Sequence, residues 1–170
     1  MKVRGCLLGI ALLTTLVSCT SSRNDGNAAD EQAIRAIYDQ YSAAVRSRNV
    51  DAIMAFYAPD DGLIAFDAFP PRQYVGAASY RKAYEGFFAA YPGPVTSEIS
   101  DLKITTDGTL GFASSIDRWV ATGSDGKATE IVFRGTNGLR KIKGKWLIVH
   151  EHVSVPVDPV TGQADFLSKR

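Results

Sequence analysis

The second half of the chain consists of long stretches rich in β-branched and aromatic residues, separated by three short turn signals. These signals are Asp107-Gly108, Asp125-Gly126 and Lys143-Gly144. A pair of this kind between two such stretches favours a tight hairpin, because glycine readily adopts the positive φ that these turns require. From Val95 onward the sequence therefore predicts a four-stranded antiparallel meander.

Helical patterns come first in the chain. Asp30 is a candidate N-cap for a long first helix, whose apolar residues recur at helical spacing: Ile34, Ile37, Tyr38, Tyr41, Ala44 and Val45. A short second helix is expected over 50–57, a strand over 63–69, and a third helix with aromatic residues from Tyr80 to Tyr91 on one face. Helices followed by a meander predict an α+β domain over 31–157, with three helices covering one face of a curved sheet and leaving a cavity.

The N-terminus has the pattern of an export signal. Lys2 and Arg4 precede an apolar run that is too short to span a bilayer as a helix. The run ends in Leu16-Val17-Ser18-Cys19, which resembles the bacterial lipoprotein box. This resemblance implies a signal peptide over 1–18 and a lipid on Cys19 that anchors an exported protein to a membrane, with the outer membrane as the default where a cell has two. The polar segment that follows, up to residue 30, is expected to be a flexible tether.

Charge and cysteine content exclude several classes of protein. Loss of Lys2 and Arg4 with the signal changes the formal net charge from +1 to about −1, so no basic surface for nucleic acid is expected. Cys6 would be removed and Cys19 acylated, which leaves no cysteine for a disulfide. The sequence contains no Gly-rich phosphate loop and no nucleophile elbow, and we expect no cofactor.

Three segments carry a resemblance to a known family: 61–67 (Asp-Gly-Leu-Ile-Ala-Phe-Asp), Tyr80-Arg81 with Glu85, and above all 144–156 (Gly-Lys-Trp-Leu-Ile-Val-His-Glu-His-Val-Ser-Val-Pro). They resemble the nuclear transport factor 2-like superfamily, in its SnoaL-like, ketosteroid-isomerase-homologue branch. The chain is also similar to the association domain of calcium/calmodulin-dependent kinase. The resemblance implies a cone-shaped fold, a conical pocket beneath the helices, and dimers or larger rings built on the outer sheet face.

Three carboxylates are candidates for chemistry in such a pocket. Alternation along the last strand places Glu151 on one face with Leu147, Val149 and Val153, where it would be the single acid in an apolar row. Either this row faces the pocket and burial raises the pKa of Glu151, or Glu151 is a paired or solvated residue. Asp67 ends the first strand.

Asp117 lies in the middle of a predicted central strand. Two interpretations stay open for it: a free carboxylate, or a partner of Arg118 or Arg134 in an ion pair.

The resemblance to ketosteroid isomerase adds specific positions. It places Tyr41 where that enzyme has its oxyanion-hole tyrosine and Asp67 where it has its proton-shuttling aspartate, and Asn137 replaces the second acid of the oxyanion hole. The kinase association domain has arginines where this chain has Asp117, Asn137 and Val153, so a ligand carboxylate does not fit the pocket.

A second cluster of polar residues is expected on the opposite sheet face. His150 and His152 alternate on the last strand, and Arg134 and Thr136 share a face of the preceding strand. A His-x-His pair binds a metal only when a third ligand converges on it, and we expect no metal here. Packing or a subunit interface is the favoured role for this cluster, and it becomes the pocket if the two sheet faces are exchanged.

Two functional classes follow. The first is a membrane-anchored lipoprotein that binds a small apolar ligand and forms a homodimer or higher homo-oligomer through its sheet. The alternative is an acid–base enzyme, an isomerase, dehydratase or cyclase, with Asp67 or Asp117 as base and Tyr41 and Asn137 as hydrogen-bond donors. A free buried carboxylate of raised pKa would favour the enzyme. The tail from Asp158 to Arg170 is expected to be frayed, unless Phe166 and Leu167 dock on a neighbour.

Overall fold

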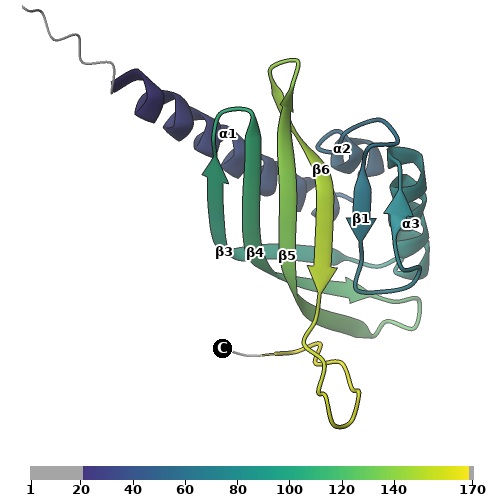
Figure 1. Cartoon of the computed structure of the whole chain (residues 1–170). Coiled ribbons are helices and arrows are strands. Elements are labelled where there is room, and N and C mark those ends of the chain that lie inside the picture. The colour runs from purple at the N-terminus through teal and green to yellow at the C-terminus, as the bar shows by residue number, and fades with distance from the viewer. Residues whose placement is uncertain (1–20, 169–170) are drawn as a thin grey trace, which may run out of the picture.

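The computed structural model describes residues 21–168, and side chains from Asn27 onward. Three helices, α1 (Ser21–Arg46), α2 (Val50–Met54) and α3 (Ala77–Ala90), cover one face of a curved six-stranded sheet (Figure 1). This is the α+β arrangement predicted from the sequence. The signal peptide over 1–18 and Cys19 lie outside the described residues. No helix in the described part is long and apolar enough to cross a bilayer.

The sheet is antiparallel except at one place. Its strands are β1 (Ile64–Phe66), β2 (Tyr74–Val75), β3 (Val95–Thr106), β4 (Leu110–Thr122), β5 (Ala128–Ile142) and β6 (Lys145–Ser154), in the spatial order β2-β1-β6-β5-β4-β3. β1 pairs in parallel with β6, and every other pairing is antiparallel. The meander over β3–β6 is confirmed, and β2 is a strand that the sequence analysis did not predict.

Each predicted turn signal joins two strands of the meander. Gly108, Gly126 and Gly144 have φ values of 93°, 77° and 80°, which residues with a Cβ rarely adopt. These three glycines therefore set the hairpin lengths, and hence which residues of β3–β6 lie opposite one another.

The start of α1 differs from the prediction. The sequence predicts a tether through residue 30 and an N-cap at Asp30, whereas α1 begins at Ser21 and Asp30 lies within it. Asp30 Oδ1 instead accepts hydrogen bonds from Lys141 Nζ at 2.6 Å and from Trp146 Nε1 at 2.9 Å. The Asp30 carboxylate, which the sequence suggested as a helix cap, therefore attaches α1 to the end of β5 and the start of β6.

Alternation along β6 is broken by a bulge. Leu139 lies opposite Ile148 and Gly138 lies opposite His150, so Val149 is an extra residue in β6. Because a bulge of one residue exchanges the two faces of a strand, Trp146 and Ile148 point inward before it and Glu151 does so after it. The prediction that Leu147 and Val149 share a face with Glu151 is therefore wrong, although Glu151 itself is on the inner face.

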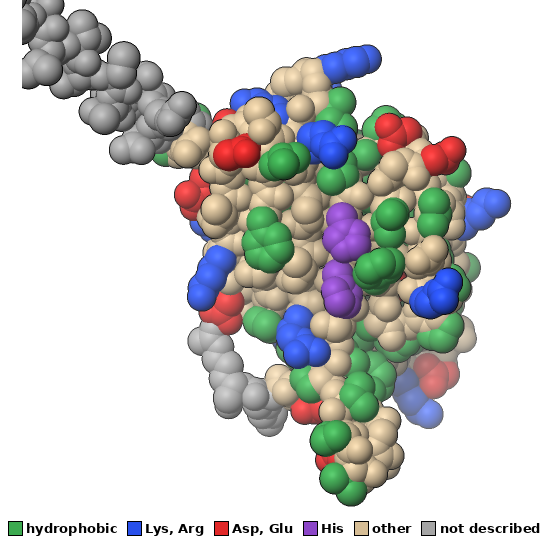
Figure 2. Space-filling model, viewed as in Figure 1, with side chains coloured by type: hydrophobic (Ala, Val, Ile, Leu, Met, Phe, Trp, Pro, Cys, Tyr) green, Lys and Arg blue, Asp and Glu red, His purple; other side chains and the backbone are tan. Residues whose placement is uncertain are grey.

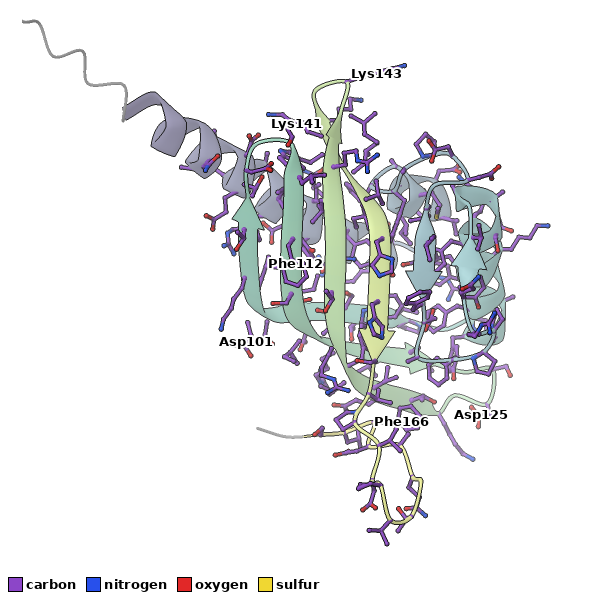
Figure 3. The ribbon with its side chains drawn as sticks, in the orientation of Figure 1. Asp101, Phe112, Asp125, Lys141, Lys143 and Phe166 are labelled. Atoms are coloured by element: carbon purple, nitrogen blue, oxygen red, sulfur yellow. The ribbon has the colours of Figure 1, made fainter. Side chains whose placement is uncertain are left out.

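The tail folds back on its own chain. Val157 and Ala164 form a bridge, the amide of Val132 donates to the carbonyl oxygen of Phe166 at 2.7 Å, and the ring of Phe166 stacks on Phe69 with centroids 5.8 Å apart. Phe166 lies beside the lower end of the sheet in Figure 3. The frayed end predicted from Asp158 is therefore wrong for the described part of the tail.

Candidate functional site

A cavity of about 260 Å³ lies between the helices and the inner face of the sheet. All five pocket candidates from the sequence analysis line it, each from a different part of the fold: Tyr41, Asp67, Asp117, Asn137 and Glu151. The remainder of the lining is mainly apolar, with Phe87 from α3 and Trp119 and Phe133 from the sheet. The long helix α1 and the curvature of β4 and β5 bring these distant segments together (Figure 1).

Glu151 is buried and fully engaged by its neighbours. Oε2 accepts a hydrogen bond from Tyr57 Oη at 2.8 Å and one from Asn137 Nδ2 at 3.0 Å, and Oε1 accepts one from Tyr80 Oη. The side chain of Asn137 is held in turn by Tyr38, whose hydroxyl donates to Oδ1 at 2.8 Å. Burial raises the pKa of Glu151, and the three donors oppose that rise.

The hydroxyl groups of Tyr57, Tyr84 and Tyr41 continue this network across the cavity. Tyr84 Oη lies 2.7 Å from Tyr41 Oη and 3.2 Å from Tyr57 Oη. Burial raises the pKa of Tyr41, Tyr57 and Tyr84, so these phenols keep their protons. The chain of hydroxyl groups therefore connects Tyr41, at the apolar end of the cavity, with the carboxylate of Glu151.

Asp117 is the carboxylate of the site that has one free oxygen atom among the described residues. It is 9% exposed, and its Oδ1 has no hydrogen-bond partner among the described residues. Burial raises the pKa of Asp117 to about 7, with a smaller contribution from the charge of Glu151, while a hydrogen bond from Ser115 acts in the opposite direction.

The two ion pairs proposed for Asp117 are not formed. Arg118 points to the other sheet face, where Nε lies 2.7 Å from Glu130 and Nη1 lies 3.3 Å from Glu98. Arg134 is exposed and lies opposite Ile116, one position away from Asp117 in register. Strand alternation thus separates both arginines from the inner face.

Gly135 leaves open space next to Asp117. A Cβ at this position would lie 3.1 Å from Asp117 Oδ2 and 3.0 Å from Ser115 Oγ, which is closer than ordinary contacts allow. Glycine in the middle of a strand often marks such a close approach. The absence of a side chain there keeps one side of the carboxylate accessible from the cavity.

Asp67 lies at the end of β1 and is half-buried in the cavity lining. Burial raises its pKa, and hydrogen bonds from the backbone amides of Ala68 and Phe69 oppose that change. Because these amides already bind its carboxylate, Asp67 is less available as an acceptor than Asp117.

The cluster of Arg134, Thr136, His150 and His152 does not line the cavity. His150 and His152 lie opposite Gly138 and Thr136, and the ring of Phe66 contacts both imidazoles at centroid distances of 5.1 and 5.8 Å. Figure 2 shows the two histidines in purple on the outer sheet face, among separate hydrophobic side chains. Among residues 21–168, no group of three or more potential ligands is arranged to hold a metal ion.

Several cavity residues were not recognised as such from the sequence. Tyr80 and Tyr84 belong to the hydrophobic core, with Phe87 and Trp119 packed against it, and all four also line the cavity, which the sequence analysis did not predict. Tyr38 and Tyr57 were not selected either. A usable signal was present, because four of these residues are tyrosines, and a buried tyrosine hydroxyl needs a hydrogen-bond partner.

Comparisons with known proteins agree with this geometry. Residues 34–158 match the family model described as a SnoaL-like domain, and the chain therefore belongs to the SnoaL-like family, within the nuclear transport factor 2-like superfamily. It is similar to a nuclear transport factor 2-like protein of unknown function from Pseudomonas putida, at 32% identity and a TM-score of 0.75 over 84% of this chain and 98% of that one. No curated protein sequence matches.

More distant structures share the fold. A provisionally named scytalone dehydratase from Novosphingobium aromaticivorans has 15% identity and a TM-score of 0.71, covering 86% of this chain and 93% of that one. A provisionally named association domain of calcium/calmodulin-dependent protein kinase II from Xanthomonas campestris has 20% identity and a TM-score of 0.63, covering 84% and 96%. Both likenesses concern the fold alone.

Proposed function

We propose that the protein is an acid–base enzyme that binds a small, largely apolar substrate in the cavity and transfers a proton through Asp117. The single observation that carries this proposal is the free, buried carboxylate of Asp117, whose pKa of about 7 leaves both protonation states available near neutral pH. A group in this condition can accept a proton from a bound molecule and give it back at the same pH.

Dehydration is the reaction class that fits best. Asp117 removes a proton from a carbon atom of the substrate, and the electron pair of that C–H bond forms a double bond as the neighbouring C–O bond breaks. The leaving hydroxyl takes that proton from the protonated Asp117 and departs as water, which returns Asp117 to its ionised form. The resemblance in fold to provisionally named dehydratases supports this class, and isomerisation differs only in returning the proton to another carbon.

A proton-transfer assay tests the proposal. The probe is 3-hydroxyindan-1-one in D₂O, whose acidic carbon lies between a carbonyl group and the carbon that bears the hydroxyl. We expect the protein to accelerate deuterium incorporation at that carbon or formation of the indenone, and Asp117→Asn to lower the accelerated rate by about 100-fold or more. Asp125→Asn, in the exposed β4–β5 hairpin, is the matched control. A wild-type rate equal to that of the Asp117→Asn variant at every pH contradicts the proposal.

Ligand binding without catalysis is the second candidate. It is favoured by the state of Glu151, because a second acid that already accepts three hydrogen bonds is poorly placed to assist a reaction. In this alternative the protein carries an apolar ligand at the membrane to which a lipid on Cys19 would attach it. Binding of 3-hydroxyindan-1-one with no proton exchange would favour this candidate.

Self-association through the outer sheet face belongs to the same proposal. Ile64, Val75 and Phe112 are 38%, 50% and 54% exposed there, around the histidine cluster. Sedimentation of the purified domain tests for a homo-oligomer, and Phe112→Glu is expected to lower its mass to that of a monomer. Phe112 projects from the sheet face nearest the viewer in Figure 3. A monomer at every concentration contradicts this part of the proposal.

A further inference from the structure

Two buried side-chain polar atoms in the described part of the chain have no hydrogen-bond partner, and both belong to cavity-lining residues. They are Asp117 Oδ1, an acceptor, and Trp119 Nε1, a donor. The two residues are two positions apart on β4 and therefore point to the same face of the sheet. Since buried polar groups normally have partners, this pair indicates what a ligand has to supply at this end of the cavity.

The tyrosine network adds an acceptor at the same end. Tyr57 and Tyr80 each donate their single hydroxyl proton to Glu151. The proton in the 3.2 Å contact between Tyr57 and Tyr84 therefore comes from Tyr84, and the proton in the 2.7 Å contact between Tyr84 and Tyr41 comes from Tyr41. By accepting from both Tyr57 and Tyr80, Glu151 thus orients the whole chain of hydroxyl groups toward itself.

The consequence concerns Tyr41, whose ring lies 6.4 Å from that of Trp119. With its proton directed to Tyr84, the Tyr41 oxygen presents lone pairs to the cavity and accepts hydrogen bonds. This is opposite to the oxyanion-donor role that the resemblance to ketosteroid isomerase implies for Tyr41.

The charge of the lining restricts the ligand further. Asp67, Asp117 and Glu151 all border the cavity, whereas none of the described lining residues is Lys, Arg or His. A ligand anion would meet three carboxyl groups with no compensating cation. An ammonium ion could donate a hydrogen bond to Asp117, but it has no lone pair to accept one from the indole N–H of Trp119. A ketone could accept from Trp119, but it has no proton to donate to Asp117 or Tyr41.

We propose that the ligand of this cavity is a neutral, largely apolar alcohol, with a hydroxyl group that donates to Asp117 or Tyr41 and accepts from Trp119. A hydroxyl group has one proton and two lone pairs, and so it matches both kinds of free atom. The inference rests on the proposed function in that it names the substrate class of the same cavity, and it agrees with a reaction that removes water.

Five compounds built on one ring frame test the proposal: 1-indanol, 1-indanone, 1-aminoindane, indane-1-carboxylate and indane. Calorimetric titration of the wild-type chain at about pH 8 keeps the amine charged, the ligand carboxylate ionised and Asp117, whose pKa is about 7, mainly in its acceptor form. We expect 1-indanol to bind at least about tenfold more tightly than each of the others, which corresponds to about 1.4 kcal/mol.

Two variants test whether the preference for 1-indanol comes from a hydrogen bond to Asp117 or only from the shape of the cavity. Asp117→Asn keeps the size of the side chain and adds N–H donors, so we expect the preference for 1-indanol over 1-indanone to fall at least tenfold or to reverse. Asp125→Asn is expected to leave the order of the five compounds unchanged, because Asp125 lies in an exposed hairpin away from the cavity.

Each contrary result has a distinct meaning. Binding of 1-indanone, 1-aminoindane or indane-1-carboxylate as tightly as 1-indanol overturns the assignment of an alcohol, while the cavity remains a binding site. Binding of none of the five overturns the assignment together with the cavity as a ligand site. If the wild-type protein does not accelerate proton exchange of 3-hydroxyindan-1-one but still binds 1-indanol most tightly, the proposed enzymatic function is contradicted and the preference for an alcohol is retained.

Discussion

Replacing Asp117 by asparagine is predicted to change stability in a manner that depends on pH. In the folded chain the pKa of this carboxyl is about 7, compared with an ordinary value of 3.8. The folded state therefore binds the proton more tightly than the unfolded state. Wild-type stability accordingly falls as pH rises from about 4 to about 7 and is level above that, as far as this group is concerned.

The size of this effect follows from the two pKa values. Between about pH 4.5 and about pH 8, the shift destabilises the wild-type chain by about 3 kcal/mol, because each pKa unit corresponds to about 1.4 kcal/mol. Asparagine does not ionise, so the stability of the variant does not fall with pH through this side chain. We therefore compare the free energy of unfolding of Asp117→Asn with that of the wild type at each pH. Relative to the wild type, the variant is expected to be about 3 kcal/mol more stable at about pH 8 than it is at about pH 4.5.

Urea unfolding of both proteins at the two pH values measures this difference. Any constant cost of placing an amide in the cavity cancels in the comparison, as does the contribution of Asp67, and the contribution of Glu151 cancels apart from its smaller coupling to Asp117. A change of less than about 1 kcal/mol between the two pH values refutes the reasoning, because Asp117 would then be solvated or paired in solution.

Three further outcomes are expected. Tyr57→Phe removes one donor from Glu151, which raises the pKa of that carboxyl further and lowers the free energy of unfolding at neutral pH by about 1.5–3 kcal/mol in urea titrations. Gly135→Ala places a methyl group 3.1 Å from Asp117 Oδ2 and is expected to weaken binding of 1-indanol at least about tenfold by calorimetry. Gly138→Ala, whose Cβ would meet only His150 Cβ at 3.4 Å, is the matched control and should bind as the wild type does.

Local sequence signals predicted the meander well. The Asp-Gly and Lys-Gly pairs determine the turns by themselves, since the positive φ of each glycine is a property of a few residues. The order of the helices and the α+β class followed from periodicity. Asp30 shows the limit of such signals, because its partners Lys141 and Trp146 are more than one hundred residues away in the chain.

The sequence indicated some residues of the site but not their connections. The five pocket candidates all line the cavity, yet the sequence could not distinguish Asp117, with its free oxygen, from the engaged Glu151. That distinction depends on Tyr57, which follows α2, on Tyr80 in α3 and on Asn137 in β5, which converge on one carboxylate. The bulge at Val149 was equally invisible, because it depends on the register between β5 and β6.

The titration of the Asp117 side chain in the intact domain tests the central claim most directly. Carbon-13 NMR of a protein labelled at the aspartate carboxyl carbons resolves this group, and the spectrum of Asp117→Asn assigns it by the signal that disappears. The structure predicts a midpoint at about pH 7. A midpoint close to the ordinary aspartate value of 3.8 would mean that Asp117 is a solvated or paired acid, and it would contradict both the proposed proton transfer and the site on which it rests.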